Sequence, residues 1–134
     1  MTPEHERGLL DTSVLVDLPS LRLQDIIGSA AISAVTLAEL TAGPSATKDP
    51  VVRAKRQQYV QWVENTLDVL PVDASAARYY GYLCSLVYAQ GRQPRGRIAD
   101  LLIASTAAAR QLPLLTRNPK DFVGLEPAVT VIAV

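Results

Sequence analysis

The stretch GLLDTSVLVDL, residues 8–18, carries the two local signals on which the fold prediction depends. Its first three residues are apolar and lead to Asp11, which predicts a short buried strand that ends on a carboxylate. Thr12 or Ser13 can then cap a helix that runs through Val16, because a hydroxyl there accepts a hydrogen bond from a backbone N–H of the first turn. A strand followed at once by a helix is the usual opening of an α/β fold.

Strand and helix signals alternate along the rest of the chain. Further strands are expected at residues 30–34, 68–72 (a strand or an extended connector), 112–116 and 129–134. Helices are expected at residues 35–40, 50–66, 74–91 and 97–111, with a turn of helix at 119–123. Short apolar strands separated by helices, with no Asn-Gly hairpin, predict an α/β fold of three layers, α/β/α, with a short central parallel sheet.

Composition limits the classes of protein that need to be considered. The chain has 134 residues, which suits a single domain over residues 1–134, and 13 basic residues balance 13 acidic ones. No global field therefore points to a polyanion or a membrane. One cysteine, Cys84, and one histidine, His5, disfavour disulfides, Cys-rich zinc sites and histidine-based catalysis. No uncharged run reaches the roughly 20 residues of a spanning helix, and no signal peptide is evident, so we expect a cytoplasmic protein.

Four acidic residues stand in or next to apolar segments, where a solvated charge is out of place. They are Asp11, Glu39, Asp100 and Asp121. In a parallel sheet, ligands bind outside the carboxyl ends of the strands, and these acids are predicted to lie near that edge. Converging carboxylates repel one another unless a cation lies among them, and oxygen ligands without His or Cys suit Mg²⁺ or Mn²⁺. Such ions activate water and support displacement at phosphorus.

Each acid also has a purely structural role open to it. Thr36 and Glu39 have the spacing of a capping box, in which the Glu reaches back to a backbone N–H. Asp100 could stabilise its helix N-terminus or pair with Arg97, three residues earlier. Asp11 could cap the helix that follows the first strand. Asp121 could simply be a solvated acid in a loop.

An ordered set of segments resembles a known family. LLDTSVLVDL, the Glu in AEL, RIADLLIAS, and LLTRNPKDF with a short terminal strand are similar to PIN domains. The similarity is greatest to the VapC-type ribonucleases, which are the toxins of type II toxin–antitoxin pairs. It extends over nearly the whole chain and implies a PIN-like α/β/α fold.

The resemblance implies an endoribonuclease that depends on Mg²⁺ or Mn²⁺. By this resemblance, the family's first three acids, which are catalytic residues and metal ligands, correspond to Asp11, Glu39 and Asp100. Many relatives have Asp where this chain has Asn118, so the fourth ligand is expected at Asp121, the nearest carboxylate. Supporting roles fall on Ser13, Thr116 and Asn118. The resemblance also implies a VapB-like antitoxin, an RNA substrate and a homodimer, and no membrane.

Other functions remain open on the sequence. One alternative is a non-catalytic PIN-like module that binds RNA or acts as a scaffold. A haloacid-dehalogenase-like phosphatase is disfavoured, because it needs a second Asp two residues after Asp11, where this chain has Ser13. A basic segment, GRQPRGR, places Arg92, Arg95 and Arg97 before Asp100, where they could hold RNA phosphates or form a solvated loop.

Overall fold

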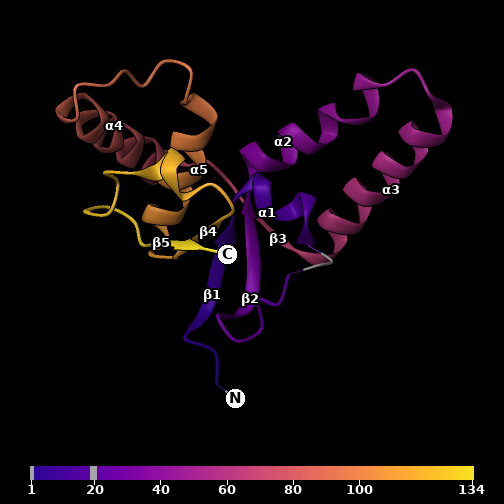
Figure 1. Ribbon diagram of the computed structural model, residues 1–134, viewed down its shortest axis with the longest axis horizontal. Coiled ribbons are helices and arrows are strands. Elements are labelled where there is room, and N and C mark those ends of the chain that lie inside the picture. The colour runs from indigo at the N-terminus through magenta and orange to yellow at the C-terminus, as the bar shows by residue number, and fades with distance from the viewer. Residues whose placement is uncertain (1, 19–20) are drawn as a thin grey trace.

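Five parallel strands form one sheet in the order β3-β2-β1-β4-β5 (Figure 1). The computed structural model describes residues 2–18 and 21–134. The strands are β1 (His5–Leu10), β2 (Ile27–Ser33), β3 (Asp68–Leu70), β4 (Leu114–Thr116) and β5 (Val131–Ala133). The helices are α1 (Thr12–Val16), α2 (Ala34–Ala42), α3 (Pro50–Thr66), α4 (Ala74–Ala89) and α5 (Ile98–Ala109). Two 3-10 turns, η2 (Pro44–Ala46) and η3 (Pro119–Phe122), complete the fold.

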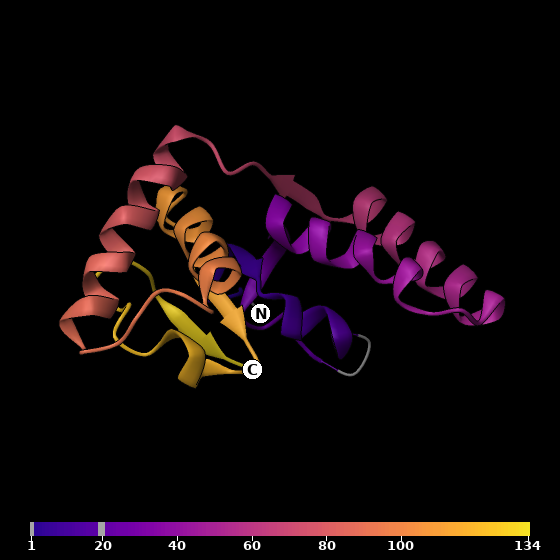
Figure 2. The ribbon, with the colours of Figure 1, turned by 90° about the horizontal axis from the view of Figure 1, so that it is seen from above.

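The sheet has a separate apolar core on each face, which confirms the predicted three-layer arrangement. Successive side chains of a strand point to opposite faces. Leu9 accordingly packs in one core with Leu83 of α4 and Ile103 of α5. Leu10 packs in the other core with Val63 of α3. Figure 2 shows α4 and α5 on one side, with α2 and α3 extending away as a pair on the other.

Local signals explain where the long helices begin. Asp49 precedes Pro50, and its Oδ1 accepts hydrogen bonds from the backbone N–H groups of Val51 (2.9 Å) and Val52 (3.4 Å). Proline suits the first helical position because its missing N–H would be unpaired there anyway. The prediction of a helix over residues 50–66 is therefore confirmed to the residue.

Two predictions about helix caps and one about the start of a strand are wrong. Neither Thr12 nor Ser13 caps α1: Asp11 occupies the N-cap position, yet its side chain makes no capping hydrogen bond. The second strand begins at Ile27, earlier than predicted, and Ser33 at its end caps α2 by accepting from Val35 N (3.1 Å). Residues 36 and 39 do not form the predicted capping box, because Ser33 is the N-cap and both residues lie inside α2.

The remaining element predictions agree with the structure to within about three residues, a normal uncertainty for element ends. The prediction at residues 68–72 is resolved in favour of a strand, and the turn at 119–123 is η3. α5 is buried along most of its length, as its apolar sequence predicted. None of the helices in the described ranges combines the length and apolar character that crossing a bilayer requires.

Candidate active site

The site lies where the chain changes direction across the sheet. From the central strand β1 the chain adds β2 and β3 on one side, and it later adds β4 and β5 on the other. Leu10 pairs with Leu115, so Asp11 and Thr116 lie level at the carboxyl ends of adjacent strands. A switch point of this kind is where parallel α/β sheets bind ligands.

Asp11 is held in place by two hydroxyls. Its side chain is buried, with the residue only 5% exposed. Ser13 Oγ and Thr116 Oγ1 donate to Asp11 Oδ2 over 2.7 Å and 2.9 Å. The carboxylate therefore turns into the site instead of capping α1, and Ser13 and Thr116 take the supporting positions that the sequence predicted.

The loop after β4 is fastened to the same two hydroxyls. The backbone N–H of Arg117 donates to Ser13 Oγ (3.0 Å), and that of Asn118 donates to Thr116 Oγ1 (3.0 Å). The side chain of Asn118 is exposed and makes no hydrogen bond within the described part of the chain. Asn118 therefore orients the loop through its backbone, while its amide group stays free to reach a ligand.

Glu39 reaches the site from the middle of α2. The residue is exposed, and Thr12 Oγ1 of α1 donates to its Oε1 over 2.7 Å. Thr12 Oγ1 also lies 3.1 Å from the buried Thr36 Oγ1, one turn earlier on α2. Sequence reasoning named Ser13 and missed Thr12 and Thr36 as members of the site. The sequence places the Thr12 hydroxyl next to Asp11, but its partner depends on where the fold places α2 relative to α1.

Asp100 lies in the first turn of α5, where the charges of the other acids act on its carboxyl group. Partial burial and, after it, the charges of Asp11, Asp121 and Glu39 raise the pKa of Asp100 from 3.8 to about 6, while Arg97 acts in the opposite direction. Acids from α2, from η3 and from the junction of β1 and α1 therefore lie near enough to Asp100 to act on it electrostatically. That they act in catalysis stays a prediction.

Asp121 is attached to the start of α5 by Arg97. Arg97 Nη1 donates to the backbone carbonyl of Asp121 (2.9 Å), and Nη2 lies 3.9 Å from Asp121 Oδ1. The ion pair that the sequence suggested between Arg97 and Asp100 is therefore made with Asp121 instead. Arg92 and Arg95 are exposed and keep the position of a basic rim, whereas Arg97 is half-buried within the site.

The donors around the site fit a hard cation by their chemistry. They are carboxylate and hydroxyl oxygens, the ligand type that Mg²⁺ and Mn²⁺ prefer. Across residues 2–18 and 21–134, no three His, Cys, Asp or Glu side chains are gathered closely enough to hold an ion. Mg²⁺ does not need such a cage, because it commonly keeps several waters and takes one or two carboxylates together with substrate phosphates.

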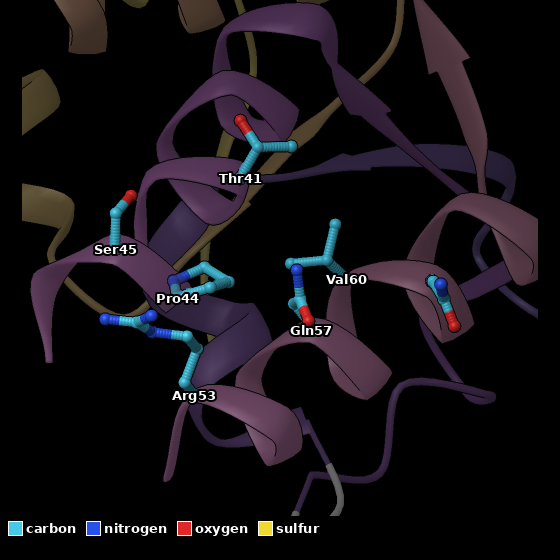
Figure 3. A pocket seen from close by; sticks show the side chains of 7 residues that line it. Thr41, Pro44, Ser45, Arg53, Gln57 and Val60 are labelled. Atoms are coloured by element: carbon cyan, nitrogen blue, oxygen red, sulfur yellow. The ribbon is translucent and has the colours of Figure 1, made fainter. Parts of the chain in front are cut away.

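Two cavities flank the α2–α3 pair. One, of about 560 Å³, is mainly apolar and includes Glu39, Leu15 and Tyr59 in its wall, so it opens beside Glu39. The other, of about 450 Å³, lies between the end of α2 and α3 and includes Thr41, Ser45 and Gln57 (Figure 3). None of the four acids lines this second cavity, and we assign it no part in the site.

Comparison with known families identifies the class to which this fold and site belong. The model of the PIN domain family matches residues 8–123. The matched range includes all four acids. The chain therefore belongs to the PIN domain family.

Individual relatives place the chain within that family. It is 40% identical to Ribonuclease VapC5 of Mycobacterium tuberculosis, over 92% of this chain and 91% of the relative. The crystal structure of VapBC-5 from the same species, a member of the VapBC family of toxin–antitoxin systems, matches with a TM-score of 0.80 and 38% identity. That match covers 96% of this chain and 97% of the other. VapBC2 from Rickettsia felis, solved with a DNA fragment from its promoter, matches with a TM-score of 0.75, 26% identity, and coverage of 96% and 98%.

Proposed function

We propose that this protein is a metal-dependent endoribonuclease and the toxin of a type II toxin–antitoxin pair. The observation that carries the proposal is that Asp11, Glu39 and Asp121 lie near enough to Asp100 for their charges, together with its burial, to raise its pKa to about 6. The VapC relatives, which are named as ribonucleases, supply the substrate class. RNA as the substrate also implies action in the cytoplasm.

Asp11 and Asp100 are the residues that we propose to hold Mg²⁺ or Mn²⁺, with Glu39 and Asp121 acting on the ion or on its waters. When bound, the ion supplies charge for a hydrolytic water and for the phosphodiester. Ser13 and Thr116 hold Asp11 Oδ2, which leaves Oδ1 without a hydrogen bond among the described residues. Arg97 keeps the Asp121 loop beside Asp100 and offsets part of the negative charge.

The partner that we propose is a VapB-like antitoxin, because the relatives of this fold are solved as toxin–antitoxin complexes. The apolar cavity beside Glu39 is suited to a segment that covers the acids, and Lys55 and Arg56 on its wall favour an acidic segment. We also expect the toxin to form a homodimer.

A paired expression experiment tests the function. Wild-type protein and Asp11→Asn are produced in the same host without antitoxin, and growth and RNA integrity are scored together. We expect arrest and RNA cleavage with the wild type alone, since the variant loses a charged ligand but keeps an isosteric side chain. Equal behaviour of the two proteins would favour the alternative of a non-catalytic PIN-like module that binds RNA or acts as a scaffold.

A further inference from the structure

A pair of threonines connects the interior of the protein to Glu39. Thr12 Oγ1 lies 2.7 Å from Glu39 Oε1 and 3.1 Å from Thr36 Oγ1. A hydroxyl has one proton to donate and two lone pairs, whereas an ionised carboxylate can only accept. Thr12 Oγ1 is placed as the donor in both contacts, so its one proton serves one acceptor at a time. The shorter distance to an ionised acceptor favours Glu39, and Thr36 remains a second polar contact of the same oxygen.

The three residues become more exposed in the order Thr36, Thr12, Glu39. Thr36 is 0% exposed, Thr12 is half-buried and Glu39 is exposed. Thr36 and Glu39 lie three residues apart on α2 and so share one face of the helix. A buried hydroxyl needs a partner, and Thr12 is the one that the described residues provide for Thr36. The row of oxygens begins in the core and ends at the acid.

We propose that Thr36 and Thr12 form a hydroxyl relay that positions Glu39 for metal binding. The inference rests on the proposed function, because it assigns the relay's purpose to the metal site. Glu39 is an exposed side chain with several rotatable bonds, and a short hydrogen bond from a residue on a different element limits where its carboxylate can lie. The buried Thr36 gives Thr12 Oγ1 a second polar contact, which holds that oxygen beside α2.

Isosteric substitutions test the relay by metal affinity. Thr12→Val removes the donor to Glu39, and we expect Mn²⁺ to bind roughly tenfold more weakly in calorimetric titration, because partners of metal ligands commonly carry 10–100-fold in affinity. Thr36→Val leaves the Thr12 proton in place and should weaken binding by less. Thr12→Ser and Thr36→Ser keep the hydroxyls and should restore wild-type affinity.

Thr41→Val is the matched control on the same helix. The Thr41 hydroxyl donates to the carbonyl of Ala38 (2.8 Å), and Thr41 lines the second cavity, whose wall includes none of the four acids (Figure 3). It should leave Mn²⁺ affinity unchanged. Because the two relay substitutions act along one path, the double variant Thr12→Val/Thr36→Val should bind no more weakly than Thr12→Val alone. Additive losses, or equal losses in the Thr41 control, would overturn the relay.

A metal-free measurement separates the relay from the function on which it rests. NMR relaxation of the side-chain carbons of Glu39 should show an ordered carboxylate in the wild type. It should show greater mobility of that carboxylate in Thr12→Val and Thr36→Val. A mobile Glu39 in the wild-type protein overturns the relay even if RNA is cleaved. If the wild type neither binds Mn²⁺ nor cleaves RNA, the proposed function fails and so does the relay's purpose, whatever the order of Glu39.

Discussion

Asp100 is the residue at which electrostatics has the clearest consequence for stability. Its pKa is about 6 in the folded protein against an ordinary 3.8, through burial and the neighbouring acids. Between these two values the folded state keeps the proton and the unfolded state does not. Stability contributed by this group is therefore present at low pH and lost as the pH rises through about 6.

We therefore expect Asp100→Asn to be more stable than wild type above pH 6 in the absence of metal. The gain should be about 1–2 kcal/mol, since a pKa unit corresponds to about 1.4 kcal/mol and solvent screens part of the repulsion. Urea unfolding in EDTA at a series of pH values measures it. The two proteins should converge near pH 4, and a gap that is constant with pH would contradict the assignment.

The fourth acid gives a second prediction at the residue scale. Asp121 contributes negative charge near Asp100, whereas Asn118 contacts the site only through its backbone. Asp121→Asn should slow RNA cleavage and be partly rescued by high Mn²⁺, and Asn118→Ala should have a small effect. Asp11→Asn should stay inactive at every Mn²⁺ concentration. Cleavage rates against Mn²⁺ decide the matter, and an inactive Asn118→Ala with a fully active Asp121→Asn would show that the fourth ligand is misplaced.

Among the elements, α3 has the simplest local determinant. Its first turn depends on Asp49, which accepts from two backbone N–H groups. Asp49→Ala should lower the free energy of unfolding by about 1 kcal/mol, whereas Asp49→Asn keeps an acceptor and should cost little. Denaturant titration of the three proteins checks this. Equal losses in both variants would indicate that the charge matters and the hydrogen bonds do not.

At the scale of the whole molecule, zero net charge means that RNA must be attracted by local positive charge. We expect Arg92→Ala and Arg95→Ala to weaken RNA binding, each reducing the salt dependence of log K by roughly 0.7 for a single strand. Arg53→Ala is the control, because its guanidinium donates to the carbonyl of Thr47 on the distant end of the α2–α3 pair. Fluorescence anisotropy at several salt concentrations measures the slopes, and equal losses at all three positions would exclude the rim as the contact surface.

Arg97 differs from Arg92 and Arg95 in having a partner within the site. Its guanidinium is already engaged with Asp121, so removing it disturbs the acid loop as well as any phosphate contact. The sequence could not separate these roles, because spacing along the chain groups the three arginines together. Only the packing of η3 against the start of α5 distinguishes them.

The sequence by itself determined the order of strands and helices along the chain and the parallel sheet, and it named the four acids whose roles stay predictions. These follow from local signals such as the apolar run before Asp11 and the Asp49–Pro50 helix start. Such signals act over a few residues, so the chain reveals them without its fold. The ends of elements were less certain, because Ser33 and Asp11 can serve either a cap or a neighbouring side chain.

Only the tertiary structure decided which side chains hold the acids. Ser13 and Thr116 meet on Asp11 because β1 and β4 pair in one register, although 103 residues separate the two hydroxyls. Thr12 reaches Glu39 across 27 residues because β1 and β2 pair in parallel and α1 and α2 begin at their adjacent carboxyl ends. A hydrogen bond depends on separations of a few tenths of an ångström, and those are set by the packing of whole elements, which no local pattern in the chain records.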